Sequence, residues 1–270
     1  MTCFGVSFAA RDGMRTCLAA FCVIALAASP ALAQDDAQRV PTPPLATRST
    51  PDFLFGRPMG SVSIRGSWLF ARSGSDWYSF VTDQLTLNRR DFNAPGVVGE
   101  VAIALNDRLE AVAGVDFSRS GQESEYRHFV DNNRQPINQH TDLRQANITG
   151  SLKFSLVSRG RGISQLAWIP RTVTPYVGAG GGMLWYQLRQ AGDFVDFVDL
   201  SVFTDAFESQ GWTPTAHVLG GVDVRVARRL YVTFDARYRW AAADLSSQWV
   251  SFDPIDLSGV RLSAGINVPF

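Results

Sequence analysis

Only one histidine falls within a predicted strand, and it is the first residue to consider for chemistry. His217 shares one face of an alternating stretch with Asp223 and Arg225. A histidine could act as the base of a hydrolytic centre if a serine stood two residues away on that face, but Leu219 occupies this position. Nucleophilic catalysis needs a positioned nucleophile and an orienting group as well as a base. We therefore interpret His217 as an interior polar residue and expect no catalytic residues and no enzymatic activity.

Charged residues form a second candidate set, because they recur on one face of several otherwise apolar stretches. Five are acidic and six are basic: Glu100, Glu110, Asp116, Asp223 and Asp235, with Arg65, Lys153, Arg225, Arg237, Arg239 and Arg261. On the inside of a narrow barrel, such charges either pair into a closed plug or line a charged pore. We favour the plug, because an eight-stranded barrel is just wide enough for side chains to fill it.

Aromatic residues in the connectors form the third candidate set. They recur next to aliphatic and acidic residues in four separate connectors: Trp77, Tyr78, Phe80, Phe129, Phe194, Phe197, Trp249 and Phe252. They could extend the strands and pack together as a small extracellular core. They could equally line a hydrophobic recess or gate into which an apolar ligand partitions.

The composition limits other kinds of chemistry. All three cysteines, Cys3, Cys17 and Cys22, lie in the first 33 residues, so the remainder has no thiol for a disulfide or a metal site. The 25 basic and 25 acidic residues balance, which gives no basic excess for nucleic acid. We expect no metal, no cofactor and no nucleic-acid partner.

Eight segments have the alternation that positions these residues, with apolar side chains on one face and polar ones on the other. They cover residues 60–72, 97–105, 109–117, 146–154, 174–188, 216–226, 230–240 and 257–270. The fifth is the least regular, and its glycines suit strong curvature or close backbone approach. No apolar run of about 20 residues follows position 33, so helical spans are not expected. The pattern predicts an all-β, closed, eight-stranded antiparallel transmembrane β-barrel with its charged faces inside.

Connector lengths indicate the orientation of this barrel. The connectors after the first, third, fifth and seventh segments are long, while those after the second and sixth are short. Outer-membrane barrels have long extracellular loops and short periplasmic turns, so both ends of the barrel sequence should lie in the periplasm. The link at 157–171 is longer than a usual turn and could rest against the periplasmic membrane surface. Aromatic residues at the strand ends suit interfacial belts: Trp68, Phe70, Tyr238 and Trp240 outside, with Tyr176 and Phe270 inside.

The amino-terminal region divides into two predicted parts. Residues 1–33 have basic residues, an apolar stretch and a small-residue site before Gln34, which is typical of a secretory signal cleaved after Ala33. Translation could start at Met1 or Met14. Residues 34–58 are rich in proline, which predicts an extended, unpaired periplasmic lead-in. The barrel then occupies residues 59–270.

The segment 60–270 resembles the small eight-stranded outer-membrane barrels of the OmpA and OmpW type. The resemblance is carried by the run from Pro175 to Gly182, by the alternating hairpins and by the strand that ends at Phe270. It implies insertion by the barrel-assembly machinery, with Phe270 as the insertion signal, and a monomer among outer-membrane lipid and lipopolysaccharide of a Gram-negative bacterium. We expect a barrel alone, without the peptidoglycan-binding domain that follows the barrel in full-length OmpA-like proteins.

Three functional hypotheses follow from the sequence. The first is a structural or surface-interaction barrel with a filled interior. The second is a narrow channel for small, hydrophobic solutes that enter through the aromatic outer loops, a role that the resemblance to OmpW-like proteins also implies. The third and least favoured is a lipid-modifying enzyme.

Overall fold

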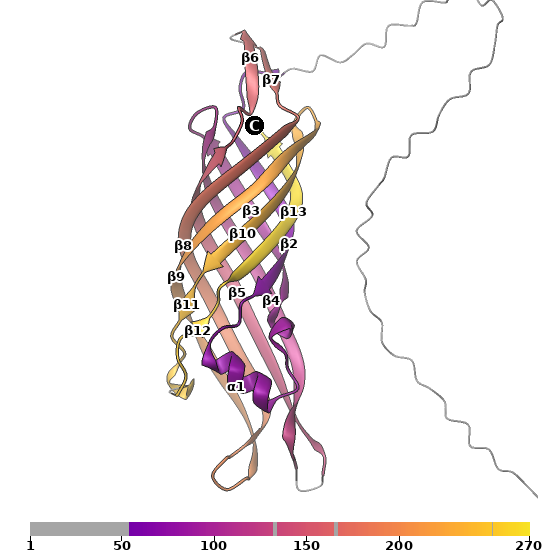
Figure 1. The fold of residues 1–270 in the computed structure, drawn as a ribbon, viewed down its shortest axis with the longest axis vertical. Helices are drawn as coiled ribbons and strands as arrows, with labels where there is room; N and C mark the ends of the chain where they lie inside the picture. Colours follow the sequence, from indigo (N-terminus) through magenta and orange to yellow (C-terminus); the bar gives the residue numbers. More distant parts are fainter. Residues whose placement is uncertain (1–53, 132–133, 165–166, 250) are drawn as a thin grey trace, which may run out of the picture. The chain divides into compact units, whose positions relative to one another are not determined.

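A computed structural model describes residues 54–131, 134–164, 167–249 and 251–270, and these form a closed antiparallel barrel (Figure 1). Neighbouring strands follow the order β10-β13-β2-β3-β4-β5-β8-β9, and β9 pairs with β10 to close the ring. The barrel strands are β2 (Gly60–Ala71), β3 (Ala94–Ala104), β4 (Leu109–Val130), β5 (Pro136–Ser155), β8 (Val173–Val195), β9 (Val202–Ala227), β10 (Leu230–Trp240) and β13 (Gly259–Pro269). The predicted fold class is therefore confirmed. The predicted signal sequence and residues 34–53 lie outside the described residues.

The two faces of the strands differ as the alternation predicts. Outward side chains such as Ile64, Val97 and Val115 are 62%, 56% and 57% exposed, whereas Arg65 on an inward face is 3% exposed. A lipid bilayer requires an apolar outer surface, and here the polar groups are turned inward. Closure of the barrel also pairs every strand edge, so no backbone hydrogen-bonding group of an edge strand faces lipid. The protein is thus a β-barrel of the outer-membrane type.

Glycines in β8 allow this strand to approach β5 closely. A Cβ atom at Gly180 or Gly182 would collide with the backbone carbonyl oxygens of Gly150 and Ile148, respectively. At Gly150 itself, nothing lies within 4 Å of an added Cβ. The glycine-rich run is therefore needed for strand contact at particular positions of the β5–β8 pair.

Four strands are much longer than the sequence pattern predicts. β4, β5, β8 and β9 contain 22, 20, 23 and 26 residues, against 11 or 12 in the other four barrel strands. A strand needs only about 9–11 residues to cross a bilayer. The two long hairpins consequently project beyond the membrane-spanning part of the barrel, at the end opposite the carboxyl terminus (Figure 1).

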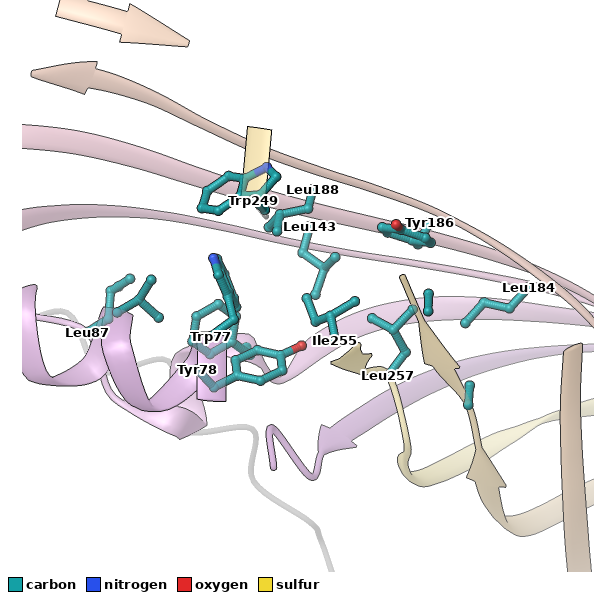
Figure 2. Close-up of a cluster of buried hydrophobic side chains, with 14 of the residues drawn as sticks. Trp77, Tyr78, Leu87, Leu143, Leu184, Tyr186, Leu188, Trp249, Ile255 and Leu257 are labelled. Carbon is teal, nitrogen blue, oxygen red and sulfur yellow. The ribbon is translucent and has the colours of Figure 1, made fainter. Parts of the chain in front are cut away.

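A hydrophobic core lies between these projecting strands and the loops that face them. The 73–93 connector contains the helix α1 (Asp76–Gln84) and the turn η1 (Arg89–Phe92), where the sequence pattern predicted no helix. The other contributing connector contains β11 (Ala242–Ala243), η2 (Ser247–Trp249) and β12 (Ile255–Asp256). Trp77, Tyr78 and Val81 on α1 are completely or almost completely buried in this cluster (Figure 2). None of the helices among the described residues is long and apolar enough to cross a membrane.

A small three-stranded sheet forms at the opposite end of the barrel. Its order is β1 (Leu54–Phe55), β7 (Ala167–Pro170) and β6 (Gly160–Ser164), and we call it the lid. Leu54 pairs with Trp168, so the end of the proline-rich segment is paired and the prediction of an unpaired lead-in is wrong there. The 157–171 link is correspondingly folded into two strands.

Candidate functional site

The barrel interior, or lumen, contains a central group of four charged residues. The Glu100 carboxylate lies between two guanidinium groups, 2.6 Å from Arg65 Nη2 and 2.5 Å from Arg237 Nη2. Asp235 Oδ1 lies 3.9 Å from Arg237 Nε. These residues come from β2, β3 and β10, and all four side chains are largely buried. Their closeness offsets part of the cost of removing each charge from water.

A second group lies nearer the lid. Lys153 Nζ lies 2.8 Å from Asp223 Oδ2 and 3.7 Å from Glu110 Oε2. Arg159, which comes from the 157–171 link rather than from a barrel strand, forms an ion pair with Glu110 and donates to the Asn106 carbonyl at 2.7 Å. The sequence pattern missed Arg159 because it has no place in a strand alternation. It places a charged contact at the lid end of the lumen.

The third group lies toward the projecting strands. Asp116 Oδ1 is 2.8 Å from Arg261 Nη2 and 3.8 Å from Arg239 Nη1. Arg239 also donates to the side-chain oxygen of Gln145 and, at 3.0 Å, to the Leu257 carbonyl. Neutral polar side chains therefore complete a network that charge alone would leave incomplete.

Two residues of the predicted set behave differently from the rest. Arg225 is half-buried near the lid end, where its backbone N–H donates to the Thr172 carbonyl. Tyr176 was predicted in the interfacial belt, but it is 2% exposed and faces the lumen. Its hydroxyl donates to Asp235 at 3.3 Å, and Lys153 Nζ lies 3.7 Å from its ring centroid. The irregular alternation of β8 explains the error, because small residues on both of its faces do not show which face points into the lumen.

His217 has a polar partner that sequence reasoning did not identify. Its Nε2 atom lies 2.8 Å from Ser151 Oγ on β5, and Gly180 of the intervening strand β8 is in register with both residues. Both side chains are buried, and no described residue forms a hydrogen bond with Nδ1 of His217. An acyl-transfer centre would need an accessible nucleophile and a group orienting the imidazole through its other nitrogen. The pair lacks both features, so it carries no argument for catalysis.

The predicted aromatic residues of the outer connectors are brought together, but in two environments. Trp77 and Tyr78 lie inside the hydrophobic core, where Trp77 packs edge to face against Trp249 with ring centroids 6.0 Å apart (Figure 2). Burial is the largest cause that raises the pKa of the Tyr78 phenol, and the nearby Asp256 carboxylate adds to it. This hydroxyl therefore stays protonated at neutral pH.

Five of the predicted aromatic residues line a recess beside that core, and Phe129 contacts one of them. Phe80 contacts Phe197 and Phe252 with ring centroids 6.3 and 5.4 Å apart, and Phe129 contacts Phe197 at 5.9 Å. The recess has a volume of about 210 Å³. Its lining includes Phe80, Phe194, Phe197, Phe203, Phe207, Trp249 and Phe252, together with Gln139 and Gln190. We call this feature the aromatic recess.

Polar groups are present within the aromatic recess. The Gln139 amide donates to the Asp193 carbonyl at 2.9 Å and to the Tyr126 hydroxyl at 3.3 Å, and the Gln190 amide donates to Gln139. Both glutamines are almost fully buried. Apolar walls with a few fixed polar groups are typical of small-molecule sites. Among the described residues, no group of three or more potential metal-ligating side chains is close enough to hold a metal ion.

Comparison with known proteins gives similarity to solved barrels only. No protein-family model and no curated protein matches the sequence. Among solved structures, the chain is similar to Neisserial surface protein A, with 16% identity, a TM-score of 0.43, and 78% of this chain and 97% of that chain covered. It is also similar to OprG from Pseudomonas aeruginosa, with 12% identity, a TM-score of 0.42, and 80% of this chain and 99% of that chain covered. It is similar as well to Ail, the attachment invasion locus protein of Yersinia pestis, with 14% identity and a TM-score of 0.41. This similarity covers 77% of this chain and 98% of that chain. We draw nothing about function from these similarities.

Proposed function

We propose that this protein is a closed barrel of a Gram-negative outer membrane that acts as a structural or surface-interaction component. The observation that carries the proposal is the succession of features along the barrel axis. The three charge groups occupy the lumen, the hydrophobic core lies at the end of the projecting hairpins, and the Arg159–Glu110 pair lies at the lid end. In this proposal, the two projecting hairpins and the loops packed against them present the surface that meets other molecules.

Energetics favour a filled lumen over a conducting one. An ion or water file through the lumen would have to separate Glu100 from Arg65 and Arg237, whose side chains are 11%, 3% and 6% exposed. Breaking a buried ion pair by removing one partner costs about 3–5 kcal/mol. The hydrophobic core would also have to open, and fully buried Trp77 alone represents several kcal/mol of apolar burial.

The remaining features of the proposal concern assembly. The carbonyl oxygen of Phe270 accepts hydrogen bonds from the backbone N–H groups of Met59 and Gly60, at 2.9 and 3.3 Å, and its ring is exposed. In our proposal, Phe270 is the signal that the barrel-assembly machinery recognises, and a monomer then resides among outer-membrane lipid and lipopolysaccharide.

Efflux from proteoliposomes tests the closed-barrel proposal. Vesicles that contain the folded protein should retain a small, charged fluorophore as well as protein-free vesicles do. A variant without residues 76–84 and with Glu100, Arg65 and Arg237 changed to alanine should leak, because it removes the helix of the hydrophobic core and the central charge group. Leakage through the unchanged protein at the rate of that variant would contradict the proposal.

The aromatic recess favours a second candidate function, the binding of a small apolar molecule at the outer mouth. A volume of about 210 Å³ exceeds the roughly 150 Å³ cavity that accepts benzene. The recess therefore suits a molecule with one or two rings, while the buried glutamines supply a polar contact. Binding there requires no passage through the lumen, so this candidate retains the hydrophobic solute of the channel hypothesis without the channel.

Titration with a fluorescent naphthylamine probe tests the second candidate. Phe194→Ala should weaken binding, because this buried ring forms part of the wall of the aromatic recess. Phe234→Ala, on the lipid-facing surface of β10, is the matched control and should leave binding unchanged. Equal affinity in all three proteins would assign the probe to the detergent or lipid around the barrel.

A further inference from the structure

Charged residues in the connectors are segregated between the two ends of the barrel. The connectors at the lid end, 54–59, 105–108, 156–172 and 228–229, contain seven arginines and only one acidic side chain, Asp107. The connectors at the other end, 72–93, 131–135, 196–201 and 241–258, contain nine aspartates and four arginines. The seven arginines are Arg57, Arg108, Arg159, Arg161, Arg171, Arg228 and Arg229, and we call them the arginine collar.

Within the part of the chain that the structure describes, two members of the arginine collar have an acidic partner. Arg57 Nη1 lies 2.7 Å from Asp107 Oδ1, and Arg159 pairs with Glu110. The other five are exposed, and within the described residues none of them forms an ion pair. Like charges close together repel one another, so five such guanidinium groups at one rim favour an external anion.

The arginine collar begins where the apolar outer belt ends. Exposed Leu105 precedes Arg108 by three residues, exposed Val226 precedes Arg228 by two, and exposed Val173 follows Arg171 by two. Apolar side chains of this belt contact acyl chains, so the next turn of the chain reaches the depth of the lipid headgroups. Arginine holds phosphate strongly there, because its planar fork donates two parallel hydrogen bonds.

We propose that the arginine collar binds the phosphate-bearing headgroups of anionic phospholipids in the leaflet at the lid end of the barrel. This inference rests on the membrane insertion in the proposed function, but not on whether the lumen conducts. Through its headgroup contacts, the collar would fix how deeply the barrel sits in the bilayer. The aspartate-rich connectors at the opposite end would leave that side without such contacts.

Native mass spectrometry of lipids retained by the barrel tests this proposal. The protein is reconstituted in nanodiscs of phosphatidylcholine with one tenth phosphatidylglycerol and then released in a mild detergent. Each basic residue near an anionic surface contributes on the order of a fivefold preference. Changing Arg161, Arg171, Arg228 and Arg229 to glutamine should therefore lower the enrichment of phosphatidylglycerol over phosphatidylcholine by at least about tenfold.

A matched variant removes the same charge from the other end of the barrel. Arg89, Arg90, Arg134 and Arg189 are exposed there, and their change to glutamine should leave phosphatidylglycerol enrichment within about twofold of the unchanged protein. Retained heat-modifiable migration in gels would show that both variants are folded. Equal enrichment in the collar variant and this control would overturn the proposal.

Two further arms identify the source of the anion. Excess glycerol phosphate should displace little phosphatidylglycerol if the membrane-anchored headgroup is the ligand, whereas complete displacement would assign the arginine collar to free phosphate. A soluble polyglutamate should bind no more tightly to the unchanged protein than to the collar variant. Tight, collar-dependent polyglutamate binding without phosphatidylglycerol enrichment would assign the collar to an anionic polymer and overturn the lipid proposal. Conductance measured in parallel reports on the lumen alone. Current steps would contradict the closed-barrel proposal, whereas loss of phosphatidylglycerol enrichment reports on the arginine collar.

Discussion

Replacing Glu100 by glutamine should destabilise the folded barrel strongly, although the side chain hardly changes in size. One oxygen of the Glu100 carboxylate forms an ion pair with Arg65, and the other accepts a hydrogen bond from Arg237. Glutamine keeps one acceptor and places an amide donor against the second guanidinium group. Two buried cations would then share one neutral partner, and only Asp235, 3.9 Å from Arg237, would remain nearby.

The expected magnitude follows from two independent estimates. A hydrogen bond to a charged group contributes about 1.5–3 kcal/mol, and Glu100 accepts one from Arg237 beside its ion pair with Arg65. Removing one partner of a buried ion pair costs about 3–5 kcal/mol. We therefore expect Glu100→Gln to lower the free energy of unfolding by about 3–5 kcal/mol.

Urea unfolding in lipid vesicles, followed by tryptophan fluorescence, measures this free energy. The matched control is Glu125→Gln, an exposed carboxylate on the projecting part of β4, which should change it by no more than about 0.5 kcal/mol. Adding Arg65→Met to Glu100→Gln removes the unpaired cation, so the double variant should be more stable than Glu100→Gln alone. A loss below about 1 kcal/mol in Glu100→Gln, or no recovery in the double variant, would refute the paired lumen.

Three other changes test separate parts of the structure. Gly182→Ala should reduce the yield of folded barrel measured by heat-modifiable gel migration, because its Cβ meets a β5 carbonyl, while Gly150→Ala should fold normally; equal yields would argue against close approach of β5 and β8. Trp77→Ala should destabilise the hydrophobic core by about 3–5 kcal/mol and expose α1 to limited proteolysis without unfolding the barrel; unchanged cleavage would contradict its role in holding α1. A cysteine at Val198, which is 93% exposed at the tip of a projecting hairpin, should react with an impermeant label on intact cells, and one at Arg228 should not; the reverse pattern would invert the orientation.

The transmembrane part of the fold could be predicted because lipid imposes a strict alternation. Outward Ile64 and inward Arg65 could exchange faces only by exposing a charge to lipid, so the register is strongly specified. Beyond the membrane this constraint ends. Residues 118–130 continue β4 with serine, glutamine and glutamate rather than with apolar residues, and no periodicity of hydrophobicity marks them as strand.

The helix α1 illustrates a second limit of sequence reasoning. Its sequence, from Asp76 to Gln84, contains aromatic and β-branched residues that favour strands as much as helices. It is helical because Trp77, Tyr78 and Val81 reach the hydrophobic core from one side of the helix. Packing between distant segments thus decides a local structure that propensity leaves open.

The partners inside the lumen could not be predicted even though most of the charges were. Sequence alternation shows that Glu100 and Arg237 face inward, but their contact depends on barrel shear and strand order. Arg159 and Ser151 were missed for related reasons. Arg159 lies outside the barrel strands. Ser151 contacts His217 past Gly180 of the intervening strand β8, so this contact depends on the register of three strands.

Conductance of single, folded barrels in planar bilayers tests the closed lumen most directly. The unchanged protein should insert without discrete current steps across a range of voltages, because the charge groups and the hydrophobic core both block the axis. The variant without residues 76–84 and with Glu100, Arg65 and Arg237 changed to alanine should conduct, which shows that insertion is detectable. Reproducible current steps from the unchanged, demonstrably folded barrel would contradict the account and make it a channel.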